Sequence, residues 1–132
     1  MSQYVHVECN VLEDVKVNIL NKALSNMKGG LSMKPVNKAK PNRLRGKVDT
    51  VLCDHGNETS IGFQFVPNKN NKLKLVVAGE FYGSGFNKND FIDDLCKNYQ
   101  LAHVNQMIKD NNWNMVSRKV EEDNTVVLRV AV

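Results

Sequence analysis

The stretch NKNDFIDDLCKNYQLAHVNQMIKDNN, residues 87–112, has the clearest pattern in the chain and predicts an amphipathic helix. Asn87 can cap its first turn, because an Asn side-chain oxygen accepts a hydrogen bond from an unpaired backbone N–H, and Asp90 suits the positive end of the helix dipole. Apolar residues recur at helical spacing on one side, at Phe91, Leu95, Tyr99 and Ala102, with Ile92, Cys96 and Met107 widening the same face. One face of this helix should therefore be buried and the other exposed.

Residues 113–132 predict a β-hairpin that packs on this helix. Two apolar strands, 113–120 and 125–132, flank a polar turn. In the second strand Val126, Leu128 and Val130 share one face, while Arg129 lies on the other. Because a lone hairpin is only marginally stable in water, we expect the helix to cover its apolar face together with strands from earlier in the chain.

The preceding sequence predicts one more helix and four strands. The helix covers residues 12–27, and the strands cover residues 4–9, 48–53, 60–66 and 72–78. Three of these strands follow one another through short turns, which favours an antiparallel meander over parallel βαβ units. The predicted fold is a single α+β domain over residues 1–132. It is a two-layer sandwich with a mostly antiparallel sheet of about five to six strands and two helices on one face.

Composition limits the class of protein. The chain has 132 residues, 42% of them apolar, which is typical of a globular domain with one core. No apolar run approaches the length of about 18 residues that crosses a membrane, and no secretory signal is visible. The three cysteines (Cys9, Cys53 and Cys96) are far apart and odd in number, which indicates free thiols in a reducing compartment. We therefore expect a cytoplasmic protein that does not bind a membrane.

The positive charge is concentrated in residues 31–47, called the basic segment below. This segment holds six cations and no acid, namely Lys34, Lys38, Lys40, Arg43, Arg45 and Lys47. Since the whole chain has a net charge of +4, the remainder is about −2. Its prolines and weak periodicity predict a loop or mobile arm, of which residues 31–36 could add an irregular edge strand. A segment with this charge can bind an acidic protein partner or a nucleic acid. The simpler alternative is a surface loop that only increases solubility.

Two groups of motifs stand out beside these patterns. The central group is Arg43-Leu44-Arg45-Gly46, residues 48–53 and Ile61-Gly62-Phe63; the C-terminal group is Phe91, Leu95, Tyr99, Val104, Trp113 and residues 124–130. Together they resemble the hypothetical chloroplast open reading frame thirty-five family, over nearly the whole chain. That family occurs in algal plastids, cyanobacteria, other bacteria and some phages, and it is a domain of unknown function.

The resemblance implies a compact α+β fold and supplies no catalytic residue. The chain departs from the family at its end, where Ala131-Val132 replaces the usual aromatic residue. Residues 31–41 are a second departure, a basic insert that is particular to this chain.

Four groups of residues suggest chemistry, and each has a simpler structural interpretation. His6, Cys9, Cys53 and His55 are types that zinc accepts, but their spacing does not match a zinc module, so we expect buried cysteines and surface histidines. Cys96 and His103 lie about 10 Å apart along one helix, too far for a nucleophile–base pair. Asp93-Asp94 diverge on the helix surface, and Gly83-Ser84-Gly85 lacks the rest of a P-loop. We therefore expect no metal, no cofactor and no catalytic residue.

The sequence thus predicts a non-enzymatic binding module or adaptor that acts on a protein partner through the basic segment and the sheet surface. The six cations would steer the partner, and Phe81, Tyr82 and Phe86 would anchor it unless they belong to the core. An inhibitor of a host protein, encoded by a phage and acting in the host cytoplasm, is one form of this hypothesis. The alternatives are a non-specific nucleic-acid-binding protein and a small metalloprotein or enzyme. The sequence leaves the oligomeric state open.

Overall fold

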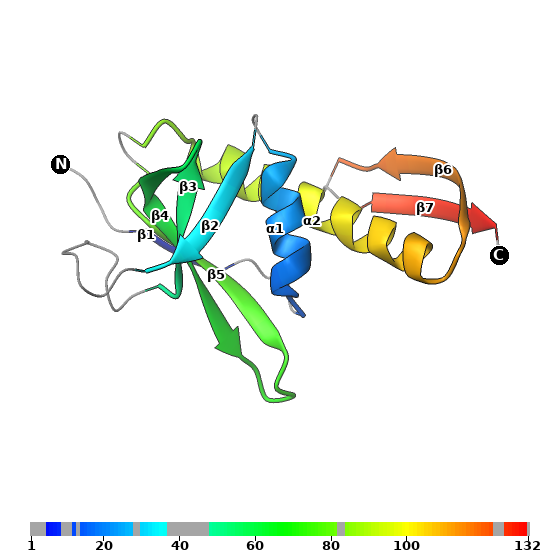
Figure 1. The fold of residues 1–132 in the computed structure, drawn as a ribbon, viewed down its shortest axis with the longest axis horizontal. Coiled ribbons are helices and arrows are strands. Elements are labelled where there is room, and N and C mark those ends of the chain that lie inside the picture. The colour runs from blue at the N-terminus through cyan, green and yellow to red at the C-terminus, as the bar shows by residue number, and fades with distance from the viewer. Residues whose placement is uncertain are drawn as a thin grey trace.

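The computed structural model describes residues 5–8, 12, 14–27, 30–36, 48–81, 84–122 and 126–131, which form two helices and seven strands (Figure 1). In chain order they are β1 (Val5–Glu8), α1 (Val17–Ser25), β2 (Leu31–Pro35), β3 (Thr50–Asp54), β4 (Asn57–Pro67), β5 (Leu73–Gly79), α2 (Lys88–Asp110), β6 (Asn114–Val120) and β7 (Val126–Ala131).

The main sheet is antiparallel and has the strand order β1-β5-β4-β3-β2. Strands β2 to β5 are consecutive neighbours, so the predicted meander is confirmed and gains β2 at its edge. The turn between β3 and β4 is shorter than expected, because His55 and Gly56 both adopt left-handed conformations with φ of 51° and 83°. Two successive residues of this kind make the tight turn whose twist matches a hairpin. The two helices and this antiparallel sheet together confirm the predicted α+β class.

Helix α2 begins and ends close to where the sequence predicts. The side chain of Asn87 accepts a hydrogen bond from the backbone N–H of Asp90 at 3.1 Å, which caps the first turn. After Asp110 the chain leaves the helix, and Asn112 adopts a left-handed φ of 55°. Of the helices in the described part of the chain, neither is both long and apolar enough to cross a membrane.

Helix α1 is shorter than predicted and begins only at Val17. The residues before it run alongside β5 instead of continuing the helix. The backbone N–H of Val15 donates to the carbonyl of Leu73 at 2.9 Å, and that of Leu75 donates to the carbonyl of Leu12 at 3.4 Å. Leu12 and Val15 are buried, as their spacing suggests, but in an extended segment. The apolar pattern therefore identified buried positions correctly and the conformation incorrectly.

Both helices cover the same face of the main sheet. Buried residues of α1 and α2 belong to one cluster with strand residues such as Leu52, Phe63 and Val77. At its centre Phe91 is 2% exposed, and the exposed fraction of Leu95 is 0%. Burial of this apolar surface is the main source of stability, at roughly 25 cal/mol per Å².

The C-terminal hairpin is not part of the main sheet, which corrects the sequence prediction. Strands β6 and β7 pair with each other in a separate two-stranded sheet. The main sheet therefore lacks the two hairpin strands that the prediction of six strands included. The buried residues of α2 all lie between Phe91 and Ala102. Because α2 is about 35 Å long, whereas five strands span only about 20 Å, its C-terminal half projects beyond the sheet. The hairpin lies beside that projecting half (Figure 1).

Candidate binding surfaces

The structure describes one of the six cations of the basic segment. Lys34 lies on β2, an edge strand of the main sheet, and it is exposed. The other five (Lys38, Lys40, Arg43, Arg45 and Lys47) and Tyr82 lie outside the described residues. Their assignment to a binding surface stays a prediction.

Phe81 is part of the core, which corrects its assignment as an exposed anchor. Its side chain is 8% exposed, and its ring centroid lies 6.0 Å from that of Phe91. Phe86 is partly buried and meets Phe91 edge-on at 5.5 Å. Both aromatic residues therefore pack the connection between β5 and α2 onto the core, and neither is available as a large exposed anchor.

Lys34 pairs across the sheet surface with a residue of β4. Its Nζ lies 3.2 Å from Oε1 of Glu58, and both side chains are well exposed, so this ion pair contributes at most about 1 kcal/mol. Burial raises the pKa of the nearby Cys53 thiol, an effect that Lys34 partly offsets and Glu58 reinforces. Cys53 and Cys96 are both buried, as predicted, and a buried protonated thiol is unreactive.

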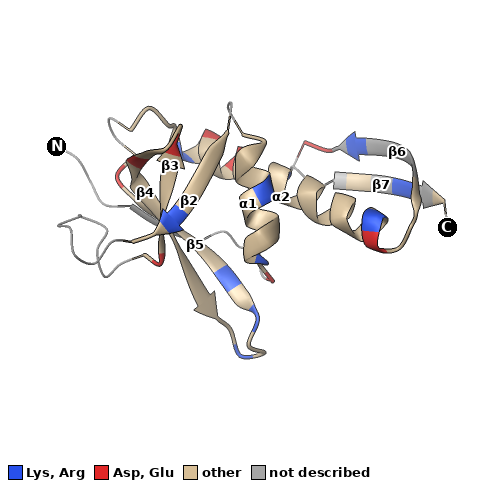
Figure 2. Cartoon of the chain, in the orientation of Figure 1, with Lys and Arg blue, Asp and Glu red and all other residues tan. Residues whose placement is uncertain are grey.

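The β4–β5 ribbon carries a cationic group that the sequence analysis did not recognise. By "ribbon" we mean residues 64–76, the end of the β4–β5 hairpin that extends past the rest of the sheet (Figure 1). No acid occurs between residues 59 and 79, whereas Lys69 and Lys72 are exposed and Lys74 is partly exposed. Figure 2 shows basic residues along β5 and at the tip. The acids that adjoin the ribbon lie at its base, where Asp49 accepts a hydrogen bond from the backbone N–H of Phe65 at 2.7 Å and Asp14 precedes Val15, which bonds to Leu73.

The tip of the ribbon is held by hydrogen bonds centred on Asn68. Its side-chain oxygen accepts from the backbone N–H groups of Asn70 at 2.9 Å and Lys72 at 3.1 Å. Its own N–H donates to the carbonyl of Lys72 at 2.8 Å, and its carbonyl accepts from Asn71 at 3.0 Å. Asn71 adopts the left-handed φ of 59° that Asn tolerates well. These hydrogen bonds together close the turn at the tip.

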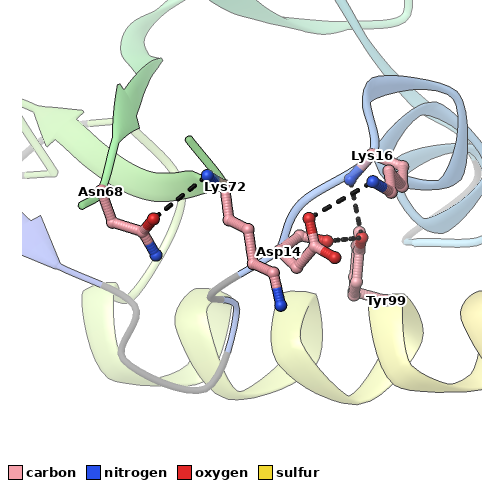
Figure 3. Close-up of polar contacts among 5 residues, drawn as sticks. All are labelled: Asp14, Lys16, Asn68, Lys72 and Tyr99. Atoms are coloured by element: carbon pink, nitrogen blue, oxygen red, sulfur yellow. Dashed lines mark hydrogen bonds and ion pairs between the residues drawn. The ribbon is translucent and has the colours of Figure 1, made fainter. Parts of the chain in front are cut away.

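Tyr99 connects the base of the ribbon to α2 (Figure 3). Its hydroxyl accepts a hydrogen bond from the backbone N–H of Lys16 at 2.9 Å and donates one to the carbonyl of Asp14 at 3.4 Å. Asp14 and Lys16 also form an exposed ion pair at 3.3 Å. Since Val15 is hydrogen-bonded to β5, this contact holds the segment that borders the ribbon against the helix.

A Tyr99→Phe variant should therefore lose about 1 kcal/mol of free energy of unfolding, the usual net contribution of one such hydrogen bond. Burial is the largest cause that raises the pKa of Tyr99 above its ordinary value. A raised pKa in the folded state gives stability that is present below pH about 10 and is lost as the pH rises through the folded value. Urea unfolding at neutral and alkaline pH should thus show a smaller alkaline loss for the variant than for the native chain. An equal loss in both would contradict this role.

An open depression of about 360 Å³ adjoins the β3–β4 turn. It is lined by Asp54, Asn57, Glu58, Thr59, Ser60 and Ser84. The hydroxyl of Ser84 donates to the carbonyl of Phe81 at 2.6 Å and accepts from the N–H of Phe86 at 3.1 Å. Ser84 therefore supports the β5–α2 connection, and the two carboxylates make the depression unfavourable for a phosphate.

The histidine and cysteine residues do not form a metal site within the described residues. No group of three or more His, Cys, Asp or Glu side chains is placed to hold a metal ion there. His55 is exposed in the β3–β4 turn, with Nδ1 2.6 Å from Oδ1 of Asp54, whereas Cys53 is buried. His6 and Cys9 offer no described side chain for comparison.

Comparison with known proteins adds no relationship. No family model matches the chain, and neither a curated protein nor a solved structure is significantly similar to it.

Proposed function

We propose that the protein is a non-enzymatic binding module or adaptor that engages an acidic, extended segment of a protein partner along β2 and the basic segment. The observation that supports this most is the position of β2. It is an edge strand, bonded to β3 on one side, and it leads directly into the five further cations of residues 38–47.

Addition of a strand explains how such a surface would bind. An extended peptide that pairs with an edge strand gains main-chain hydrogen bonds, and its side chains determine specificity. Ser32, Lys34 and Pro35 are exposed on β2, while Met33 is partly buried against the core. Lysine and proline on an edge discourage indiscriminate pairing. A basic or neutral strand would therefore be disfavoured, whereas an acidic one would be attracted.

Neutralising five cations of the basic segment should strongly reduce capture of the partner. In this variant Lys38, Lys40, Arg43, Arg45 and Lys47 are changed to Gln. Each rim cation contributes several tenths of a kcal/mol, so the five together should weaken binding about tenfold or more. The measurement is affinity capture by the full chain from a nuclease-treated lysate, with the bound proteins identified by mass spectrometry.

A control variant with five neutralised cations elsewhere separates local from overall charge. Suitable positions are Lys22, Lys88, Lys97, Lys109 and Lys119, which lie on α1, α2 and β6. The control should retain the captured protein that the segment variant loses. Equal capture by both variants, or no specific protein after nuclease treatment, would refute the proposal.

A further inference from the structure

We propose that the β4–β5 ribbon is a second binding site, separate from β2 and the basic segment, and that it binds the groove of double-stranded nucleic acid. Lys69 and Lys72 would contact phosphates, and the amides at the tip would lie along the groove. This inference uses no residue of the surface in the proposed function, so either can fail without the other.

The shape of the ribbon fits a duplex groove. Strands β4 and β5 remain paired out to Pro67 and Leu73, and residues 12–15 border β5 only as far as Leu73, so the end of the hairpin projects beyond the rest of the protein (Figure 1). The major groove of DNA, about 12 Å wide, admits a two-stranded β-ribbon of this kind. A projecting tip reaches into a groove that the flat face of a sheet cannot enter.

The tip is also preorganised. Asn68 accepts two backbone hydrogen bonds from within the turn, and its own backbone groups close the turn at Lys72 and Asn71. Because these contacts already fix the backbone, binding would order only the side chains, which lowers the entropic cost of association.

The chemistry of the tip favours nucleic acid over a protein partner. Asn68, Asn70, Asn71, Lys69 and Lys72 are all exposed, and they offer amides and ammonium groups that suit phosphates and base edges. Protein interfaces depend instead on buried aromatic or arginine anchors. Residues 66–74 contain neither type, and the exposed large hydrophobic residue there is Val66, at 37% exposure. The same lack of aromatic side chains disfavours single strands, whose bases need stacking partners.

The test measures binding of the full chain to a fluorescent DNA duplex of about 20 base pairs, by anisotropy across a range of salt concentrations. The ribbon variant combines Lys69→Gln and Lys72→Gln. The control combines Lys88→Gln and Lys97→Gln on α2, which removes the same charge away from the ribbon. Losing two phosphate contacts should reduce the magnitude of the log–log salt slope by about 2 and weaken binding at low salt about tenfold or more, whereas the control should behave like the native chain.

An Asn68→Ala variant tests the preorganisation. It retains every cation, so affinity should fall about threefold to tenfold with the salt slope unchanged, as expected when a rigid tip becomes flexible. The inference is overturned by no duplex binding at low salt, by equal salt slopes in the ribbon and control variants, or by equal or tighter binding of a single strand of the same length. It is also overturned if polyglutamate displaces the duplex when both are present at the same concentration of negative charge, because the ribbon would then recognise acidic proteins.

Discussion

The Gly79→Ala variant is expected to lose about 4 kcal/mol or more of free energy of unfolding, enough to unfold much of the protein. Gly79 has a φ of 144°, which side-chain-bearing residues rarely adopt. A Cβ there would lie 2.2 Å from the carbonyl oxygen of Ser60 and 2.8 Å from the Cα of Ile61. Both atoms belong to the backbone of the neighbouring strand β4. The clash cannot be relieved by a side-chain rotation, so the pairing of β5 with β4 must shift.

Two other glycines provide matched controls. Gly56 and Gly85 also have positive φ values, of 83° and 85°, but no atom lies within 4 Å of the position that a Cβ would occupy. Alanine at either site should cost only the backbone strain, about 1 kcal/mol. Denaturant unfolding of the three variants separates the two effects. A loss at Gly79 no larger than that of the controls would show that β5 does not approach β4 so closely.

The Phe91→Ala variant is expected to lose about 3–5 kcal/mol, because it removes the side chain on which the aromatic core converges. The ring of Phe91 contacts three others, with centroid distances of 6.5 Å to Phe63, 6.0 Å to Phe81 and 5.5 Å to Phe86. These partners come from β4, from the residues after β5 and from the approach to α2. A cavity at Phe91 therefore weakens the attachment of the helix and of the β5–α2 connection together.

Denaturant unfolding again provides the measurement, and α2 supplies the control. Met107 lies on the same helix but is 39% exposed, so Met107→Ala should cost well under the core value, about 1 kcal/mol or less. A conservative Phe91→Leu change should fall between the two, at roughly 1.5 kcal/mol. If Phe91→Ala and Met107→Ala had similar effects, Phe91 would not be the centre of the core.

Local signals in the sequence were sufficient for much of this fold. The cap at Asn87 and the periodicity after it fix α2, because both depend on residues within a few turns of each other. The alternation of Ile61 and Phe63 likewise identifies β4 and its buried face. Long-range contacts account for the errors. Helix α1 begins late because residues 12–15 bond to β5, far along the chain. The β6–β7 hairpin lies outside the main sheet because an apolar pattern marks a buried face and does not identify what covers it.

The candidate surfaces show the same limit. The distribution of charged residues in the sequence identifies the basic segment. Whether an aromatic residue can bind a partner depends on its exposure, which the sequence does not give, and Phe81 is buried. The lysines of the ribbon are visible in the sequence as outward-facing residues around a polar turn. Their importance depends on the pairing of β4 with β5 out to Pro67 and Leu73, past the end of the neighbouring strands, which is a property of the whole sheet and not of the local sequence.

The placement of β6–β7 on the projecting half of α2 predicts that the hairpin and the five-stranded sheet differ in local stability. Among the described elements, the hairpin's principal neighbour is α2, whereas the five-stranded sheet is held by both helices. Separation of the hairpin from the helix leaves the Phe91 core intact, so it needs less free energy than global unfolding. We therefore expect the C-terminal hairpin to open locally while the rest of the protein stays native.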